Sequence, residues 1–92
     1  MGIVAERMRE KLTTALEPVR LDIVDESHLH AGHSGHNSEG ESHFRVEIVS
    51  LSFAGKSRVQ RQRLVYEILR EELATRVHAL SLATYTPEES TA

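Results

Sequence analysis

Two short segments of alternating apolar and polar residues constrain the fold of this chain more than any other feature. Residues 19–25 and 43–50 both have the period-two pattern of a half-buried strand. Between them, residues 26–42 have no periodicity, and loops of this length are usually functional or disordered. Two neighbouring alternating strands favour an antiparallel pair. The apolar faces are Val19, Leu21 and Ile23 in the first strand and Phe44, Val46 and Ile48 in the second.

The segment before the first strand has the spacing of an amphipathic helix. Its apolar residues recur every four positions, with charged residues between them. Pro18 is expected to end this helix, because the residue before a proline is disfavoured in the helical conformation. The apolar residues are Val4, Met8, Leu12 and Leu16.

A second helix is expected from about residue 62 to residue 74. A turn at Gly55 precedes it, and Ser57 with Gln60 has the spacing of a capping box. Val59 is out of phase with the apolar stripe that follows, whereas Arg61 falls inside the apolar arc at about 100° per residue. We therefore expect an irregular or 3₁₀ first turn. The stripe consists of Leu64, Val65, Ile68 and Leu69.

A third alternating segment, residues 77–85, completes the set of elements and places His78 on one face with Leu80 and Leu82. Residues 87–92 follow as a C-terminal tail that begins either as a short helix or as fraying chain. The order αββαβ predicts an α+β two-layer sandwich, with a three-stranded sheet covered by helices on one face. A chain of 92 residues is expected to form one domain, residues 1–92, with one modest core.

The composition narrows the chemistry available to the chain. There is no cysteine, which excludes disulfides, thiol catalysis and a self-contained thiolate metal site. No apolar run approaches the roughly 20 residues needed to span a bilayer, and the first residues lack a signal core, so we expect a cytoplasmic protein. The net charge of −3 argues against nonspecific binding to nucleic acid.

Most of the histidines gather in and beside the aperiodic segment. The spacing of the first four fits no standard zinc signature, so a solvated polar loop and a metal-binding loop both remain open. The sixth, His78, is either a packed core residue or a ligand that the long loop approaches. The histidines of the cluster are His28, His30, His33, His36 and His43.

Four cations near the start of the second helix form a candidate phosphate-binding group. A solvated helix face with Arg61 partly packed is the alternative interpretation. No aromatic residue lies among these cations, so no base-stacking platform is apparent. No P-loop, Ser-His-Asp set or catalytic cysteine is present, so we do not expect an enzyme. The four cations are Lys56, Arg58, Arg61 and Arg63.

Several ordered stretches resemble the BolA family across nearly the whole chain. They are "DES" at 25–27, "ESHF-VEIVS" at 41–50, "F-GKS-V-R-RLVY-IL-EEL" at 53–73 and "VHALSLATYTPEE" at 77–89. The resemblance implies a fold of the class II KH type, with the same αββαβ order. Arg61-Gln62-Arg63 departs from the family's Arg-His-Arg, and the family's frequent C-terminal tryptophan is missing.

The resemblance also implies a partner and a cofactor. BolA-like proteins bind monothiol glutaredoxins, and the pair shares a [2Fe-2S] cluster. The family's C-terminal histidine matches His78, and its loop ligand matches His30, with His28 and His33 as alternatives. Since such clusters usually take four protein ligands, the remaining ones would be a glutaredoxin cysteine and glutathione. No cluster is expected on the isolated chain.

Three functions follow as hypotheses. The first is an adaptor in iron–sulfur trafficking or iron regulation that works through a glutaredoxin. The second is a DNA-binding transcriptional regulator, in which the cations at 56–63 contact phosphates. The third is a loop that binds zinc or nickel without a partner. DNA and a second copy of the chain are further candidate partners.

Overall fold

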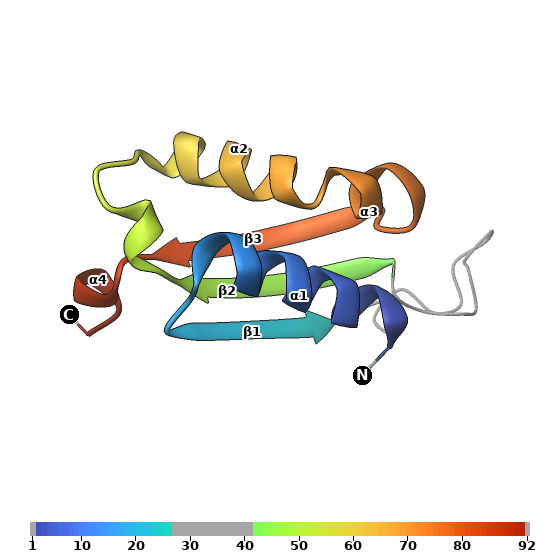
Figure 1. The fold of residues 1–92 in the computed structure, drawn as a ribbon. Helices are drawn as coiled ribbons and strands as arrows, with labels where there is room; N and C mark the ends of the chain where they lie inside the picture. Colours follow the sequence, from blue (N-terminus) through green and yellow to red (C-terminus); the bar gives the residue numbers. More distant parts are fainter. Residues whose placement is uncertain (1, 27–41, 92) are drawn as a thin grey trace.

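The computed structural model describes residues 2–26 and 42–91 (Figure 1). The predicted order αββαβ is confirmed, with three further short helical elements in the described residues. The elements in chain order are α1 (Ile3–Leu16), β1 (Arg20–Asp25), β2 (His43–Val49), the 3₁₀ helix η2 (Leu51–Phe53), α2 (Arg58–Ile68), α3 (Arg70–Thr75), β3 (Ala79–Tyr85) and α4 (Pro87–Thr91).

The three strands form one sheet in the order β1-β2-β3, so β2 is central and the other two are edges. β1 and β2 are antiparallel, as predicted, in a register that sets Asp25 opposite Phe44. β3 runs parallel to β2, with Ala79 opposite His43 and Tyr85 opposite Val49. A parallel pair requires a long crossover, which α2 and α3 supply here.

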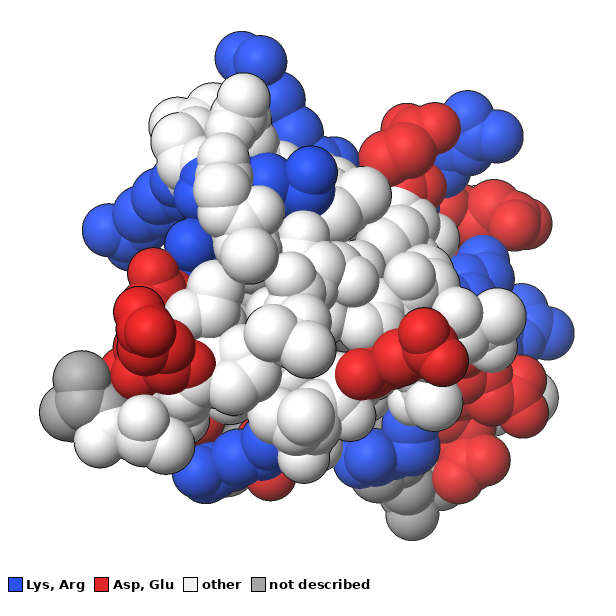
Figure 2. All heavy atoms as spheres, turned by 60° about the vertical axis from the view of Figure 1, so that its left-hand side comes forward, with Lys and Arg blue, Asp and Glu red and all other residues white. Residues whose placement is uncertain are grey.

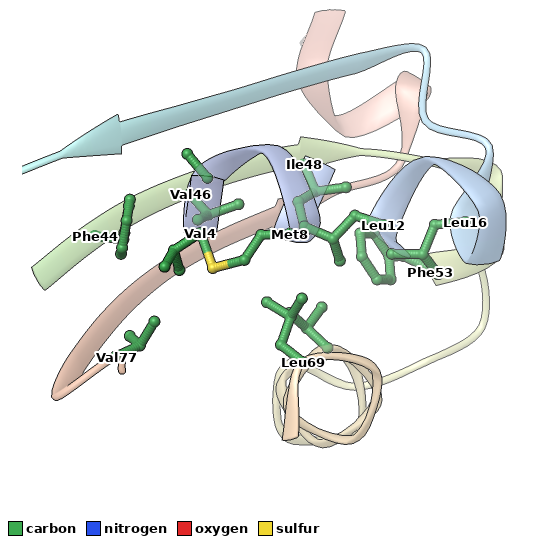
Figure 3. Packing of buried hydrophobic residues seen from close by; sticks show 12 residues of the cluster. Val4, Met8, Leu12, Leu16, Phe44, Val46, Ile48, Phe53, Leu69 and Val77 are labelled. Carbon is green, nitrogen blue, oxygen red and sulfur yellow. The ribbon is translucent and has the colours of Figure 1, made fainter. Parts of the chain in front are cut away.

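One hydrophobic core lies between the sheet and the helices, so the expected two layers are confirmed (Figure 3). The predicted stripe of α1 is buried throughout, and the alternating apolar residues of β2 face it. Phe44, Val46 and Ile48 of β2 point to one face and pack in the same cluster as residues of α1 and α2, so both helices cover that face of the sheet. The cluster includes Val4, Met8, Leu12 and Leu16 from α1, Phe44, Val46 and Ile48 from β2, and Phe53, Val65, Leu69 and Val77.

The connection from α1 to β1 follows the sequence prediction with one difference. α1 ends before Pro18, at Glu17, which has a left-handed φ of 44° and donates its N–H to the Thr13 carbonyl. Val19 was expected on the buried face of the strand, but its side chain is 68% exposed. Its N–H still bonds the Val49 carbonyl at 2.8 Å, so only its side chain lies beyond the covered part of the sheet.

The start of α2 corrects one prediction and confirms another. The capping box is present, with Ser57 and Gln60 each accepting the backbone N–H of the other. The expected irregular first turn is wrong, because a regular helix begins directly at Arg58. Val59 is 53% exposed and therefore has no need to match the buried stripe. The 3₁₀ turn lies earlier, in η2.

The long helix expected up to residue 74 is divided at Leu69, whose φ of −101° and ψ of 15° lie outside the helical range. Leu69 is fully buried, and Glu72 in α3 faces Lys11 of α1 with 2.9 Å between Oε2 and Nζ. Apolar spacing did not reveal this break because both sides of it face the core. Of the described helices, none has the length and apolar character to cross a lipid bilayer.

The segment predicted as a C-terminal tail forms the short helix α4. Thr86 and Glu89 cap its start reciprocally: Glu89 Oε1 accepts from the Thr86 N–H at 2.8 Å, and Thr86 Oγ1 accepts from the Glu89 N–H at 3.2 Å. The helical alternative for this segment is therefore the one observed.

Candidate functional site

Three parts of the chain meet at one end of the sheet. The Glu26 N–H donates to the His43 carbonyl at 2.7 Å, so the chain enters and leaves residues 27–41 at neighbouring positions. The Ser42 carbonyl accepts from the N–H groups of His78 at 2.7 Å and Ala79 at 3.2 Å. The start of β3 is thereby held beside the two ends of the histidine-rich segment (Figure 1).

His78 lies in a bend just before β3, and its side chain is exposed. The interpretation of His78 as a packed core residue is therefore wrong. Strand alternation placed His78 on the same face as Leu80 and Leu82. β3 begins only at Ala79, however, so the alternation of the strand does not determine where the His78 side chain points. An exposed imidazole at a sheet end is free to contact a partner without unfolding the strand.

The ring of His78 stacks on the ring of His43, with 6.3 Å between centroids and 26° between planes. His43 Nδ1 lies 2.8 Å from Ser42 Oγ, which restrains the orientation of this ring. Sequence reasoning missed this pair, because alternation assigned the two histidines to opposite faces. The signal that could have found it is the position of both residues at the starts of strands that pair in parallel.

The predicted loop ligands His28, His30 and His33 lie outside the described residues, so their pairing with His78 stays a prediction. Within residues 2–26 and 42–91, no three histidine, aspartate or glutamate side chains converge as a metal site would require. The whole chain also lacks cysteine. The described residues therefore offer two neighbouring imidazoles, which make an incomplete ligand set.

At the other end of the sheet, Arg61 is held by α4 and by β3. Its guanidinium binds both carboxylate oxygens of Glu89, at 2.7 and 3.1 Å, and donates to the Thr84 carbonyl at 3.2 Å. It also lies over the Phe53 ring, 5.8 Å from the centroid, and only 12% of its side chain is exposed. The partly packed alternative thus describes Arg61 correctly.

The ion pair with Arg61 changes the titration of both partners. The hydrogen bond from Arg61, followed by that from the Thr86 N–H, lowers the pKa of Glu89 to about 2. The same bond raises the pKa of Arg61. Glu89 is thus ionised at neutral pH, and Arg61 is already neutralised within the chain.

The other three cations of the predicted phosphate-binding group are exposed. Lys56, Arg58 and Arg63 have no ion-pair partner in the described part of the chain, in contrast to Arg61. Figure 2 views this end of the molecule, where basic side chains gather above a group of acidic ones and border a broad uncharged area. The structure therefore divides the group into one engaged and three available cations.

The family model described as "BolA-like protein" matches residues 12–89. The chain belongs to the BolA-like protein family. The resemblance seen in the sequence is confirmed, and the fold agrees with it. The BolA domain of SufE1 from Arabidopsis thaliana superposes with a TM-score of 0.87 at 47% identity, covering 97% of this chain and 98% of that structure.

Two relatives carry different names. "Protein BOLA1, chloroplastic" of Arabidopsis thaliana is 56% identical over 88 residues, which are 94% of this chain and 55% of that protein. "DNA-binding transcriptional regulator BolA" of Escherichia coli (strain K12) is 47% identical over 87 residues, covering 95% of this chain and 79% of the relative. The chain thus spans about half the length of the first relative.

Proposed function

We propose that this BolA-like chain is an adaptor that pairs with a monothiol glutaredoxin and shares a [2Fe-2S] cluster with it. The observation that carries the proposal is the exposed His78 ring, which stacks on His43 where the histidine-rich segment begins and ends. The role would be iron–sulfur trafficking or iron regulation and not catalysis.

The donor set of the chain fits half of such a site. A [2Fe-2S] cluster usually takes four protein ligands, of which Rieske-type centres have two histidines. This chain supplies imidazoles and no thiolate, so a glutaredoxin cysteine and glutathione would complete the set. The need for a partner follows directly from the missing cysteine.

His78 is the first proposed ligand and His30 the second. The structure adds His43 as a rival to His28 and His33, because its ring already lies against His78. Ser42 Oγ lies 2.8 Å from Nδ1 of His43, and such outer hydrogen bonds commonly orient ligating histidines. The cluster would supply redox chemistry, at a higher potential than an all-thiolate cluster. Binding should weaken at acidic pH, since protonated imidazole cannot ligate a metal.

The decisive experiment compares His78→Ala, His30→Ala and His43→Ala, with His36→Ala as the control. Each variant is mixed with a monothiol glutaredoxin, glutathione, iron and sulfide, and its visible circular dichroism is compared with that of the glutaredoxin alone. We expect His78→Ala to change the mixed spectrum most, and one of the other two to change it as well. Thermal unfolding of His78→Ala alone should match that of the parent chain, because the ring is exposed.

A parental cluster spectrum from His78→Ala would overturn the ligand assignment. If His43→Ala changes the spectrum and His30→Ala does not, the second ligand lies in β2 and not in the loop. A mixed spectrum identical to that of glutaredoxin alone, with the parent chain, would overturn the adaptor proposal itself.

A DNA-binding regulator is the second candidate function. It is favoured by the printed name of the Escherichia coli relative and by the three available cations beside Arg61. Replacing Lys56 and Arg58 together with alanine should weaken binding equally across DNA sequences, because phosphate contacts carry no base information. The slope of log affinity against log salt should fall by about 1–2 for two lost contacts.

The matched control for this experiment is Arg7→Ala with Arg9→Ala, which removes the same charge from α1. It should leave the salt slope unchanged. A double variant at 56 and 58 that alters sequence preference while keeping the slope would contradict the phosphate interpretation.

A further inference from the structure

β3 is an edge strand without the usual protection. Only β2 pairs with it among the described residues, and its sequence Ala79–Tyr85 contains no charged residue and no proline. The opposite edge, β1, carries Arg20, Asp22 and Asp25. Proteins commonly protect exposed edges with charges or proline, because a bare edge is a template for another strand. β3 therefore differs from β1 as a surface.

The hydrogen bonds of β3 identify which backbone groups face outward. The Tyr85 carbonyl accepts from the Ser50 N–H at 2.9 Å, so it points toward the β2 side. The Thr84 carbonyl accepts from Arg61 on α2, so it points away. Because successive residues of a strand alternate in direction, the N–H and C=O groups of Leu80 and Leu82 also point away from β2. They present a two-residue ladder for a further strand.

A hollow of about 290 Å³ lies beside this edge. Arg58 lines it together with residues 82–85, and Arg58 has no ion-pair partner in the described part of the chain. Arg61 lines it too, but its charge is already met by Glu89. The edge thus combines outward backbone groups at its centre with one available positive charge near its C-terminal end.

We propose that β3 receives an extended acidic peptide of a partner protein as a fourth strand. The peptide backbone would pair with Leu80 and Leu82, and an acidic side chain near its end would meet Arg58 in the hollow. Main-chain bonds would give the affinity and the carboxylate would give the selectivity, as in other cases of strand addition. The proposal does not depend on a cluster at the histidine end of the sheet.

Charge and backbone hydrogen bonding distinguish an acidic peptide from two other possible occupants of the β3 edge, a second copy of β3 and a nucleic acid. A second copy of β3 is uncharged and brings no carboxylate to Arg58 from the pairing strand itself. A nucleic acid would satisfy Arg58 but has no alternating N–H and C=O groups to pair with Leu80 and Leu82. Only an acidic peptide matches both features.

The test uses two synthetic peptides, acetylated and amidated at their ends. One is Asp-Glu-Thr-Val-Thr-Val-Glu-Asp, and the other has lysine at its four acidic positions. Acids at both ends let the probe bind in either direction. Amide hydrogen exchange by NMR should show that Leu80 and Leu82 exchange fast in the free protein and become protected by the acidic peptide. Ser81 and Ala83 should be protected throughout, because they face β2.

A charge reversal tests the selectivity. Arg58→Glu should weaken binding of the acidic peptide by about tenfold or more, as expected for loss of a charge-assisted hydrogen bond. The same change should strengthen binding of the lysine peptide. Arg7→Glu makes the same charge change on exposed α1 and should leave both affinities unchanged. Thermal unfolding of Arg58→Glu should match that of the parent, since the side chain is exposed.

Four results would overturn the proposal. They are equal binding of the two peptides, no protection of Leu80 and Leu82 at millimolar acidic peptide, protection that rises with protein concentration alone, and the same protection from a DNA duplex. The third result would assign the edge to a second copy of the chain, and the fourth would assign it to nucleic acid.

Discussion

Arg61 illustrates how a charged residue can occupy a position inside an apolar helical stripe. Its guanidinium pairs with Glu89, donates to the Thr84 carbonyl and covers the Phe53 ring. The aliphatic stem of an arginine packs like an apolar side chain while its head keeps polar partners. One side chain thereby joins α2, β3 and α4.

Glu89→Gln should make the stability of the chain vary less with pH in the acidic range. The folded state lowers the pKa of Glu89 from 4.5 to about 2, so the ionised carboxylate stabilises the fold above its unfolded pKa. That contribution is lost as pH falls from 4.5 towards 2. We expect Glu89→Gln to lower the unfolding temperature at neutral pH and to reduce the further loss over this acidic range.

The measurement is thermal unfolding followed by circular dichroism across the acidic range. Glu88→Gln, a neighbouring exposed acid on α4, is the control and should preserve the parental pH profile. An unchanged profile for Glu89→Gln would mean that the Arg61 pair contributes nothing to folding in solution.

The histidines mark the limit of prediction at this scale. Sequence pattern and resemblance together identified His78 as a candidate ligand, but alternation assigned it to the covered face with Leu80 and Leu82. The register between strands, in which His43 lies opposite Ala79, brings the two imidazoles together. Alternation within one strand carries no information about pairing between strands, so alternation alone could not reveal the contact.

At the scale of elements, local capping determines where α2 begins. Ser57 Oγ accepts the Gln60 N–H at 3.2 Å and Gln60 Oε1 accepts the Ser57 N–H at 2.8 Å. The sequence predicted this box correctly, whereas the phase of Val59 gave the wrong first turn. Apolar phase predicts a helix only where side chains are buried, and Val59 is exposed.

Ser57→Ala should destabilise the chain by about 0.5–2 kcal/mol, the usual cost of losing an N-cap side chain. Chemical denaturation gives this difference directly. Ser81→Ala removes an exposed hydroxyl from a strand and serves as the control. Equal effects of the two substitutions would indicate that the capping box does not hold in solution. Exposed Arg58 and Lys56 flank the cap, so its loss should also loosen the basic end of the helix.

At the scale of the whole molecule, one core joins the sheet to α1 and α2. Met8 is fully buried at its centre, in contact with the cluster that links both helices to β2 (Figure 3). Met8→Ala should lower the free energy of unfolding by about 2–5 kcal/mol, the range for large-to-small core substitutions. That is a large share of the roughly 5–15 kcal/mol expected for a whole domain.

The control for Met8→Ala is Ile3→Ala, because Ile3 lies on the same helix but is 63% exposed. Its free energy of unfolding should stay close to that of the parent. If Met8→Ala lowers the free energy of unfolding only slightly, the surrounding side chains collapse into the cavity.

The parallel strand β3 places the two candidate functions at opposite ends of the molecule. His78 precedes the strand, and Thr84, which Arg61 binds, comes six residues later, about 20 Å away in an extended chain. A glutaredoxin on the histidines and a phosphate backbone on Lys56 and Arg58 would therefore not compete for the same ground. We therefore expect a ternary assembly when both ligands are present. Any mutual exclusion seen in a titration would then report energetic communication along the sheet.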